Sequence, residues 1–562
     1  MTDTLSIALA QINPVVGDIA GNLALIRRRR AEAAALGADL MVTTELSISG
    51  YPPEDLVLKR QFLDEVRAAV EALAAETADG GPALIVGAPW LEDERPHGSL
   101  HKHVTDSAFV LDGGAIVGRC DKHNLPNYGV FDEKRVFKPG PLAGPIVCRG
   151  VRLGVLICED LWAPDVSECL QESGAEILVS PNGSPYEAGK VDLRLQHCIA
   201  RVGETGLPLI YVNQVGGQDE LVFDGSSFVL DTDYTLCAQL PAFREALVLT
   251  QWQRGADGGW HCADAHTEAP EVGMEPIYSA LLLGLRDYVN KNRFPGVVLG
   301  LSGGIDSALS VAVAVDALGP ERVRCVMMPS PFTSQESLED AAETARLLAT
   351  PLDTVSIAPA MQVFTDMLAP LFDSLPRDIT EENVQARSRM VTLMALSNKL
   401  GHMLLSTGNK SEMSVGYATL YGDMAGGFNV LKDVYKTTVY ALARWRNQAL
   451  PKGALGPAGR VIPERILTKA PSAELKPDQT DQDSLPPYET LDDILECLIE
   501  GDMSVADIVA RGHDRDTVNR VWRMLESAEY KRRQACPGVK ISRRAFGRDR
   551  RYPITNAFKG PL

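Results

Sequence analysis

The chain has 562 residues, and since a single domain usually takes about 100 to 200 residues, at least two domains are expected. A hydrophobic fraction of 45%, a charged fraction of 23% and a mean hydropathy of −0.05 are typical of a folded globular protein and argue against a disordered, fibrous or membrane class. Seventy-four acidic residues against 55 basic ones give a formal net charge of −19. This negative field disfavours general binding of nucleic acid and of anionic membranes.

The ten cysteines are scattered, with no CxxC pair and no cluster of Cys and His at zinc-binding spacing. This pattern favours a reducing compartment over a disulfide framework or structural zinc. The first ten residues are too acidic and too short for a signal peptide, and no later apolar run reaches the length of about 18 residues that a membrane helix needs. We therefore expect a cytoplasmic protein without a membrane segment.

Short apolar runs alternate with longer Ala-rich stretches over the first 230 residues. The runs predict buried strands, for example at 40–43, 83–86, 108–111, 153–157, 176–179 and 209–212. Stretches such as 26–36 and 63–76 predict helices. This alternation indicates a layered α/β domain. Residues 241–276 lose the periodicity and favour a linker, so the first domain is assigned to 1–265 and the second to 266–562.

Three side chains suited to amide hydrolysis stand near strand ends in this first half. Glu45 follows the strand at 40–44, Lys122 precedes the segment 123–128, and Cys158 ends the strand at 153–157. A carboxylate can take a thiol proton, an ammonium can stabilise thiolate and oxyanion, and the thiolate can attack an amide carbonyl. A single cysteine at a strand end more often fills a core. It is the combination of Glu45, Lys122 and Cys158 that indicates catalysis.

These segments resemble, in the same chain order, the Glu-Lys-Cys triad of the nitrilase or carbon–nitrogen hydrolase superfamily, over about residues 4–235. The resemblance implies an α-β-β-α sandwich with Glu45, Lys122 and Cys158 as catalytic residues. The motifs at 50–56, 125–133 and 182–186 are similar, more specifically, to the glutaminase domains of glutamine-dependent NAD+ synthetases. That similarity implies a glutamine site lined by Tyr128, Ser184 and Lys190.

A second α/β alternation follows in the other half of the chain. A helix is predicted at 278–291 and strands at 297–301, 323–328, 353–357 and 402–406. Between 451 and 487, seven prolines predict an irregular segment, which would suit a mobile substrate loop.

A glycine-rich turn, Ser302-Gly303-Gly304-Ile305-Asp306-Ser307, connects the strand at 297–301 to an apolar helix. Such a turn offers backbone N–H groups and a positive helix end to phosphate, although glycines alone would equally suit a plain turn. The Walker pattern is absent, which argues against ordinary γ-phosphate transfer. An acid in a phosphate-binding turn needs a bridging cation, so Asp306 indicates Mg²⁺.

A second polar segment, 407–412, follows the strand at 402–406. Glu412 could supply another hard oxygen ligand, while Thr407 and Lys410 could meet phosphate or ribose. Standing alone, the segment would read as a helix N-cap with an exposed Lys/Glu pair.

The string 302–307 resembles the signature of N-type ATP pyrophosphatases, which cleave ATP between the α and β phosphates and hold the departing pyrophosphate in this loop. With the segments 381–389, 407–412 and 469–475, it resembles the NAD+ synthetases over about residues 275–557, with a parallel-sheet α/β domain. The resemblance implies adenylation of the nicotinate carboxylate of deamido-NAD+, release of pyrophosphate and displacement of AMP by ammonia.

The same resemblance implies roles for individual residues of the second half. ATP would be held by Thr407 and by the turn residues Gly300, Leu301, Ser302, Gly303, Gly304, Ile305, Asp306 and Ser307. Asp306 and Glu412 would hold Mg²⁺. Deamido-NAD+ would be contacted by Asn383, Glu412 and Lys531.

The last 32 residues, from Lys531, carry ten Lys or Arg against one acid. On charge alone a solvated or partner-contacting terminus is favoured. The resemblance to the NAD+ synthetases favours an anion clamp instead, and it implies a homo-oligomer, at least a dimer.

A glutaminase joined to an ammonia-using ligase suggests a protein-lined passage for neutral ammonia, since ammonium has no lone pair with which to attack an acyl-adenylate. Two alternatives stay open. One is another ATP pyrophosphatase fused to an amidase, such as a tRNA-modifying or GMP-forming ligase. The other is a nucleotide-sensing module whose hydrolase half has decayed, although the intact Glu45, Lys122 and Cys158 argue against it.

Overall fold

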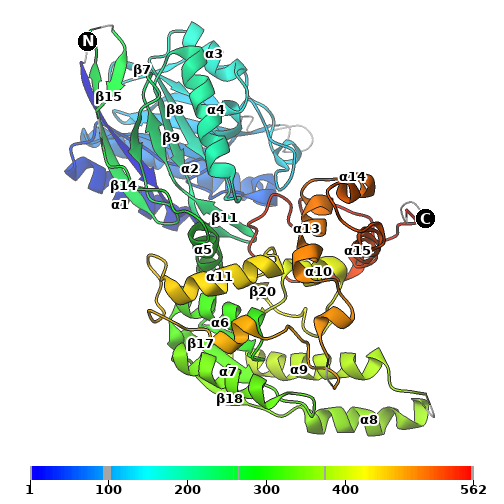
Figure 1. Cartoon of the computed structure of the whole chain (residues 1–562). Helices are drawn as coiled ribbons and strands as arrows, with labels where there is room; N and C mark the ends of the chain where they lie inside the picture. The colour runs from blue at the N-terminus through cyan, green and yellow to red at the C-terminus, as the bar shows by residue number, and fades with distance from the viewer. Residues whose placement is uncertain are drawn as a thin grey trace. The chain divides into compact units, whose positions relative to one another are not determined.

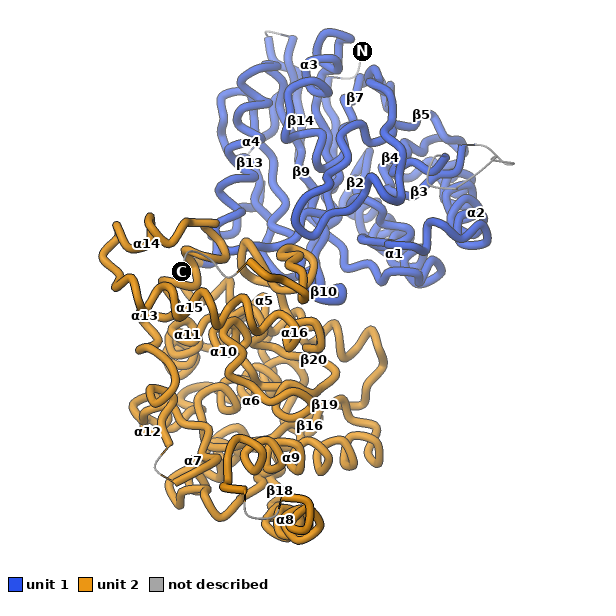
Figure 2. The backbone as a smooth tube through the Cα atoms, turned by 90° about the vertical axis from the view of Figure 1, so that its right-hand side faces the viewer, with its two compact units in different colours: residues 1–271 blue, residues 272–562 orange. Residues whose placement is uncertain are grey.

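The computed structural model describes residues 3–92, 103–256, 258–263, 265–372, 375–477 and 479–558. Contacts within the chain divide it into two compact units, residues 1–271 and 272–562 (Figure 2). Each unit has its own sheets and its own core, and each is described by itself.

Unit 1 contains two large sheets and a hairpin (Figure 1). The first sheet has the order β15 (Trp260–Cys262), β14 (Ala246–Arg254), β1 (Thr4–Gln11), β2 (Leu40–Val42), β3 (Ala83–Leu91), β4 (Val104–Asp112) and β5 (Ala115–Asp121). The second has the order β13 (Leu236–Gln239), β12 (Phe228–Leu230), β9 (Leu209–Asn213), β8 (Ile177–Asn182), β7 (Val151–Val155) and β6 (Ile146–Cys148). The hairpin pairs β10 (Val215–Gln218) with β11 (Leu221–Asp224).

The two sheets pack face to face, with helices on both outer faces. Along β1, Ile7 and Leu9 join a core shared with Val155 of the second sheet, while Ala8 points to the opposite face. This alternation follows from the period of two in a strand. Helices α1 (Ile19–Ala35) and α2 (Arg60–Glu76) cover the outer face of the first sheet, and α3 (Asp165–Glu172) and α4 (Lys190–Thr205) that of the second. The α-β-β-α sandwich expected from the sequence is confirmed.

The expectation of a linker at 241–276 is wrong, because this segment contains β14 and β15. Strand β14 pairs antiparallel with β1 along the whole length of β1, from Thr4 opposite Gln253 to Gln11 opposite Ala246. Trp252 is buried while Gln251 and Gln253 are exposed. The polar outward residues hide the alternation, and the pairing partner lies more than two hundred residues earlier in the chain, so tertiary pairing decides the structure here.

Unit 2 is built on a parallel sheet with the order β18 (Leu352–Thr354), β17 (Val323–Met327), β16 (Val297–Gly300), β19 (Met403–Ser406) and β20 (Phe428–Asn429). Around it lie α5 (Glu275–Lys291), α6 (Ile305–Leu318), α7 (Gln335–Leu347), α8 (Ala358–Phe372), α9 (Ile379–Leu400) and α11 (Lys436–Gln448). Helix α6 is apolar nearly all round and is buried along its length except at Asp306. The parallel α/β class predicted for this half is confirmed.

A helical layer near the C-terminal end of the chain has a core of its own. It contains α10 (Lys410–Val415), α13 (Tyr488–Ile499), α14 (Val505–Ala510) and α15 (Arg515–Ser527), followed by α16 (Glu529–Arg532). The described part of the proline-rich segment 451–487 contains the short helix α12 (Glu464–Thr468) and one 3₁₀ turn, η7 (Asp481–Asp483). No helix in the described residues is long and apolar enough to cross a membrane.

Candidate active sites

The three side chains assigned to amide hydrolysis come together in unit 1. Glu45 follows β2, Lys122 follows β5 and Cys158 begins a 3₁₀ turn, η5 (Cys158–Leu161), directly after the segment that continues β7. The Lys122 ammonium donates to Glu45 Oε1 at 2.6 Å, with both side chains fully buried. The charges of Glu45 and Lys122 both act on the Cys158 thiol. The two sheets of the sandwich thus each supply part of one site.

Cys158 is held in the left-handed region, with φ of 47°, a conformation that costs a non-glycine residue about 1 to 2 kcal/mol. Burial raises the pKa of its thiol well above the usual value, Glu45 raises it further, and Lys122 opposes the shift. The resting thiol is therefore neutral. It needs a base when a substrate arrives, and Glu45 is the carboxylate that can serve.

Glu133 and Tyr51 belong to this site, and the sequence reasoning did not single them out. Glu133 lies in the 3₁₀ turn η4 (Glu133–Arg135), and its Oε1 accepts from Lys122 at 2.8 Å and from the Tyr51 hydroxyl at 2.8 Å. Burial raises the pKa of Glu133 to about 7, while Lys122 acts to lower it. Both residues stood in the motifs 50–56 and 125–133, which were used only as family likeness.

Gly183 fixes the other oxygen of Glu45. Its backbone N–H donates to Glu45 Oε2 at 2.6 Å. A Cβ at this position would lie 2.9 Å from that same oxygen and 2.9 Å from the Tyr51 ring. Only glycine therefore allows the backbone to approach the base this closely.

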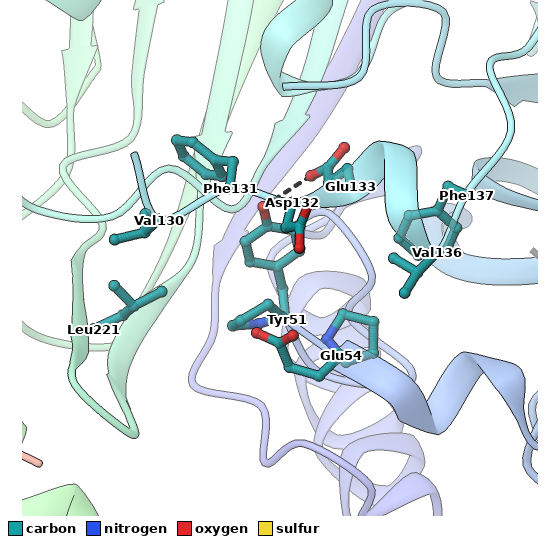
Figure 3. A pocket seen from close by; sticks show the side chains of 11 residues that line it. Tyr51, Glu54, Val130, Phe131, Asp132, Glu133, Val136, Phe137 and Leu221 are labelled. Atoms are coloured by element: carbon teal, nitrogen blue, oxygen red, sulfur yellow. Dashed lines mark hydrogen bonds between the residues drawn. The ribbon is translucent and has the colours of Figure 1, made fainter. Parts of the chain in front are cut away.

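A small cavity of about 30 Å³ adjoins Tyr51 and Glu133 (Figure 3). Its walls are mostly apolar and include Phe131, Val136 and Leu221. Figure 3 shows the Tyr51 hydroxyl directed at the Glu133 carboxylate. The volume has room for one water-sized molecule.

Two of the three residues assigned to glutamine lie on a rim beside Cys158. The Tyr128 hydroxyl donates to the Glu159 carboxylate at 2.9 Å, and the Tyr128 side chain is half exposed. The Lys190 ammonium lies 5.5 Å from the ring centroid of Phe131 and also acts on Glu159. The phenol of Tyr128, the ammonium of Lys190 and the carboxylate of Glu159 therefore lie near the Cys158 thiol.

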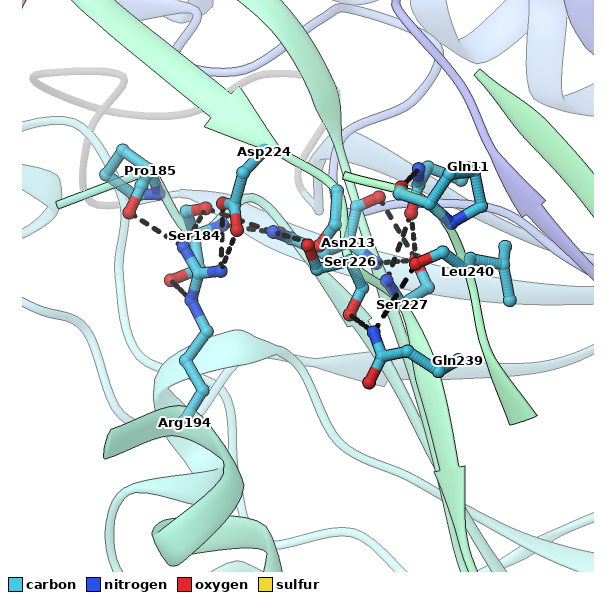
Figure 4. Close-up of polar contacts among 12 residues, drawn as sticks. Gln11, Ser184, Pro185, Arg194, Asn213, Asp224, Ser226, Ser227, Gln239 and Leu240 are labelled. Carbon is cyan, nitrogen blue, oxygen red and sulfur yellow. Dashed lines mark hydrogen bonds and ion pairs between the residues drawn. The ribbon is translucent and has the colours of Figure 1, made fainter. Parts of the chain in front are cut away.

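Ser184 is buried in a polar network behind this rim (Figure 4). Its hydroxyl accepts from Arg194 Nε at 3.1 Å, and Arg194 pairs with Asp224 at 2.8 Å. Its backbone N–H donates to Asn213 Oδ1 at 2.9 Å. The network fixes the chain that also carries the Gly183 N–H.

In unit 2, one cavity of about 620 Å³ gathers the residues that the sequence assigned to ATP, Mg²⁺ and deamido-NAD+, with the exception of Lys410. Its walls include the whole turn 300–307, Thr407, Asn383, Glu412 and Lys531. The proline-rich segment adds residues 469–475. These side chains come from strand ends, from α9 and from the chain end, and they meet at the carboxyl edge of the parallel sheet, where such folds bind ligands.

The turn itself is held by short contacts. The Ser302 hydroxyl lies 3.1 Å from that of Ser307 and accepts from the Gly304 N–H at 3.3 Å. Gly303 has φ of +80°, and a Cβ there would lie 2.3 Å from the Ser337 carbonyl oxygen. Glycine is thus required by both backbone and space. The turn opens α6, so its N–H groups and the helix dipole face the cavity.

Asp306 and Glu412 both line the cavity, and both contact the ammonium of Lys436. Lys436 binds Asp306 directly and lies 3.0 Å from Glu412 Oε1. Asn409 donates to the other Asp306 oxygen at 2.9 Å. Burial raises the pKa of Glu412 to about 7, with Lys436 lowering it and Asp306 raising it. Two hard carboxylates that converge on a positive charge fit a divalent cation such as Mg²⁺. Lys436 was missed in the sequence.

Asn383 and Lys531 also lie in the cavity wall. Asn383 Oδ1 accepts from the Thr419 hydroxyl at 3.0 Å. The Lys531 ammonium donates to the carbonyl oxygens of Gly416 and Ala418 at 2.7 and 2.6 Å, and burial lowers its pKa. Lys531 thereby ties the end of the chain to the cavity.

Lys410, which we expected to meet phosphate or ribose, is fully buried elsewhere. Its ammonium pairs with Asp433 at 2.8 Å and with Glu500 at 2.6 Å, and it donates to the Ser542 hydroxyl. The alternative prediction of an exposed Lys/Glu pair is therefore wrong. Lys410 anchors the chain end to α10.

Most of the basic tail is likewise paired inside the unit. Arg550 pairs with Glu526 at 3.0 Å, Lys540 lies 3.4 Å from Asp549, and Arg532 binds Glu529 at 2.9 Å. Of the basic residues in the described tail, Lys531 is the one that lines the cavity. These pairings engage several of the bases expected to form an anion clamp, and a clamp role for Lys531 stays a prediction. Charge composition could not show that Glu526, Glu529 and Asp549 would pair with these bases.

Two family models match the chain. One, carbon-nitrogen hydrolase, covers residues 6–261, and the other, NAD synthase, covers residues 277–535. With the buried thiol site and the cavity at the glycine-rich turn, they define a carbon–nitrogen ligase that carries its own amide-hydrolysing unit.

Full-length relatives narrow the family. The chain is 51% identical over 559 residues to the glutamine-dependent NAD(+) synthetase of Rhodobacter capsulatus, covering 100% of both chains. It is 45% identical to that of Acinetobacter baylyi, covering 99% of each. The solved structure of glutamine-dependent NAD+ synthetase from Acinetobacter baumannii with ADP has a TM-score of 0.77 at 42% identity, covering 99% of each chain. The chain belongs to the family of glutamine-dependent NAD(+) synthetases, which sets aside the other fusions and the non-enzyme considered from the sequence.

Proposed function

We propose that this chain forms NAD+ from deamido-NAD+, using ammonia that it releases from glutamine. The overall reaction is deamido-NAD+ + glutamine + ATP + water → NAD+ + glutamate + AMP + pyrophosphate. The observation that carries the proposal is the pairing, in one chain, of the buried Glu45, Lys122 and Cys158 site with a cavity lined by the turn 300–307.

In unit 1, Glu45 takes the proton of the Cys158 thiol and the thiolate attacks the side-chain amide carbon of glutamine. Lys122 stabilises the tetrahedral oxyanion. The amide nitrogen leaves as ammonia with the proton that Glu45 returns, which leaves an acyl-thioester. Water, deprotonated by Glu45, then releases glutamate. Tyr128, Ser184 and Lys190 line the glutamine site.

In unit 2, an oxygen of the nicotinate carboxylate attacks the α-phosphorus of ATP, and pyrophosphate departs into the turn 302–307. A carboxylate is a poor electrophile, and adenylation turns its oxygen into a good leaving group. Thr407 contacts ATP, and Asn383, Glu412 and Lys531 contact deamido-NAD+. Catalysis rests on positioning and charge stabilisation and needs no protein nucleophile.

Asp306 and Glu412 would hold Mg²⁺, and Lys436 stands within reach of both carboxylates. When bound, the cation neutralises phosphate charge as pyrophosphate leaves. The donor set of two converging carboxylates supports this assignment.

Ammonia passes from unit 1 to unit 2 without mixing with bulk water. In water near neutral pH almost all of it would become ammonium, which cannot attack the acyl-adenylate. A protein-lined passage keeps the nitrogen lone pair available.

The direct test measures NAD+ formation from deamido-NAD+ and ATP, with glutamine or ammonium chloride as the nitrogen donor. We expect NAD+ with both donors, and one glutamate, AMP and pyrophosphate for each NAD+ when glutamine is used. Xanthosine monophosphate in place of deamido-NAD+ should give no product. A chain that amidates the xanthosine nucleotide, or that uses ammonium only, would contradict the proposal.

The active form is a homo-oligomer in which a second copy of the chain covers α8. Val363, Met367 and Leu371 of this helix are 55%, 63% and 75% exposed, and their spacing of four residues places them on one face. None of the α8 side chains is buried. An apolar stripe of this kind marks an interface, and a second copy offers the same stripe across a two-fold axis.

Met367→Glu combined with Leu371→Glu should dissociate the oligomer, because like charges would face each other in an apolar contact. We expect light scattering after gel filtration to move from at least twice the chain mass to the single-chain mass of 60.8 kDa. Leu142→Glu, on an exposed Leu of unit 1, is the matched control. A wild-type protein that already runs at the single-chain mass would rule the interface out.

A further inference from the structure

The buried cluster at the glutaminase site contains a third carboxyl group, that of Asp106, which the mechanism above does not use. Asp106 is 1% exposed and lies on β4. One carboxylate oxygen each from Glu45, Asp106 and Glu133 all lie within 4.8 Å of one another. The single cation among them is Lys122, whose ammonium is 3.9 Å from Asp106 Oδ2. The backbone N–H of Lys122 also donates to the Asp106 carbonyl at 2.8 Å, which fixes the two residues side by side.

Three carboxyl groups converge here, and the cation that stands among them is the ammonium of Lys122. The Lys122 ammonium already stands 2.6 Å from Glu45 and 2.8 Å from Glu133. With all three carboxyls ionised, the site would bury two excess negative charges. Burial of uncompensated charge is so costly that such groups take up protons instead.

Hydrogen-bond donors decide which carboxyl takes the proton. Glu45 accepts from Lys122 and from the Gly183 N–H, and Glu133 accepts from Lys122 and from the Tyr51 hydroxyl. Among the described residues, neither carboxylate oxygen of Asp106 has a hydrogen-bond partner. An ionised Asp106 would be buried without any donor, whereas a protonated one gains an acceptor in the adjacent Glu45.

We propose that Asp106 is a positioning residue of the glutaminase site that stays protonated at neutral pH and donates a hydrogen bond to Glu45. This inference rests on the glutaminase function proposed for unit 1. Glu45 then has three donors, from Lys122, Gly183 and Asp106. They fix the position of its carboxylate, while Asp106 itself never contacts substrate.

The electrostatics around Asp106 agree with this assignment. Burial raises the pKa of Asp106 well above its usual value, the charges of Glu45 and Glu133 raise it further, and Lys122 lowers it. Asp106 also acts on the Cys120 thiol, whose pKa is raised by burial, so this thiol adds no negative charge. The Lys122 ammonium donates hydrogen bonds to Glu45 and Glu133, not to Asp106.

The experiment compares Asp106→Asn, Asp106→Leu and the control Asp121→Asn in the full chain. Asn keeps a neutral donor of the same shape, whereas Leu removes the donor. Asp121 is a buried carboxylate on the next strand that already accepts from Ser107 and Arg119. Each variant is assayed with glutamine and with ammonium, across pH, and its infrared spectrum is recorded near pH 8.

We expect a carboxylic-acid C=O band in the wild-type protein that disappears in Asp106→Asn and persists in Asp121→Asn. Asp106→Asn should keep glutamine-driven kcat/KM within about threefold, with the acid limb of its pH profile unmoved. Asp106→Leu should lose about 10- to 100-fold, the range for a hydrogen bond to a charged group, with its acid limb moved to higher pH. Ammonium-driven turnover should stay unchanged in all three.

Two results would overturn the inference. If Asp106 were ionised, Asp106→Asn would remove a charge beside Glu45 and move the acid limb down by more than about one pH unit, and the band would be missing from the wild type. If Asp106→Leu hydrolysed glutamine as fast as wild type, Asp106 would have no positioning role. A wild-type protein that never releases glutamate would instead refute the proposed function, and the infrared band would still decide the protonation state.

Discussion

Replacing Cys158 with Ala should abolish glutamine-driven NAD+ formation, by more than about 10³-fold, and leave ammonium-driven formation within about twofold of wild type. In the proposed mechanism this thiol attacks the amide carbon, and the charges of both Glu45 and Lys122 act on it. Unit 2 forms a compact unit of its own. When ATP and deamido-NAD+ are supplied, ammonia from solution can serve as its nitrogen donor. NAD+ and glutamate are measured by chromatography with each donor.

Cys169→Ala is the matched control, since this thiol is half-buried on α3, away from the site. It should leave both activities as they are. Loss of both activities in Cys158→Ala would mean that the two units do not work as separate sites. Full glutamine-driven activity would mean that a different nucleophile opens the amide.

Asp306→Asn should reduce NAD+ formation more than about 100-fold with either nitrogen donor, because the amide removes one of the two converging carboxylates. It also removes the charge that pairs with Lys436. Glutamate release at Cys158 does not depend on this carboxylate, so glutamine hydrolysis should continue. The measurement pairs an NAD+ assay with a glutamate assay on the same samples, and any remaining NAD+ formation should need a higher Mg²⁺ concentration than the wild type needs.

Asp353→Asn serves as the comparison, because Asp353 lies in the same sheet but pairs with Arg324 away from the cavity. It should form NAD+ normally. If Asp306→Asn retained ammonium-driven NAD+ formation at the wild-type rate, Asp306 would not belong to the metal site. If it lost glutamate release as well, the variant would be perturbing more than the cavity of unit 2.

Much of the fold could be predicted because buried strands leave a local pattern. The apolar runs that became β3, β8, β9 and β16 are short and contain β-branched residues, a pattern typical of strands buried between two layers. Strand β14 could not be predicted, because its outward positions carry glutamines and its partner β1 is at the other end of the unit. The apolar residues 246–249 of β14 do not reveal which strand they pair with.

The sites show the same division. Glu45, Cys158 and the turn 302–307 stand at the ends of recognisable strands, where polar side chains are conspicuous. Glu133 lies in a loop among other acids, and Tyr51 and Lys436 look like ordinary polar surface residues in the sequence. Their importance comes from burial beside a charge, which only the packed structure reveals. For Lys410 the prediction of a ligand-binding role was wrong, because its ammonium pairs with Glu500, ninety residues later in the chain.

The place of β1 in its sheet has a consequence for synthesis of the chain. This first strand hydrogen-bonds to β2 on one side and to β14 on the other. Its Gln11 side chain also donates to the carbonyl oxygens of Pro241 and Arg244. During synthesis, β1 therefore lacks one of its two neighbouring strands until β14, which ends at Arg254, has left the ribosome. The first sheet of unit 1 can therefore be completed only after Cys158 and the second sheet have been synthesised.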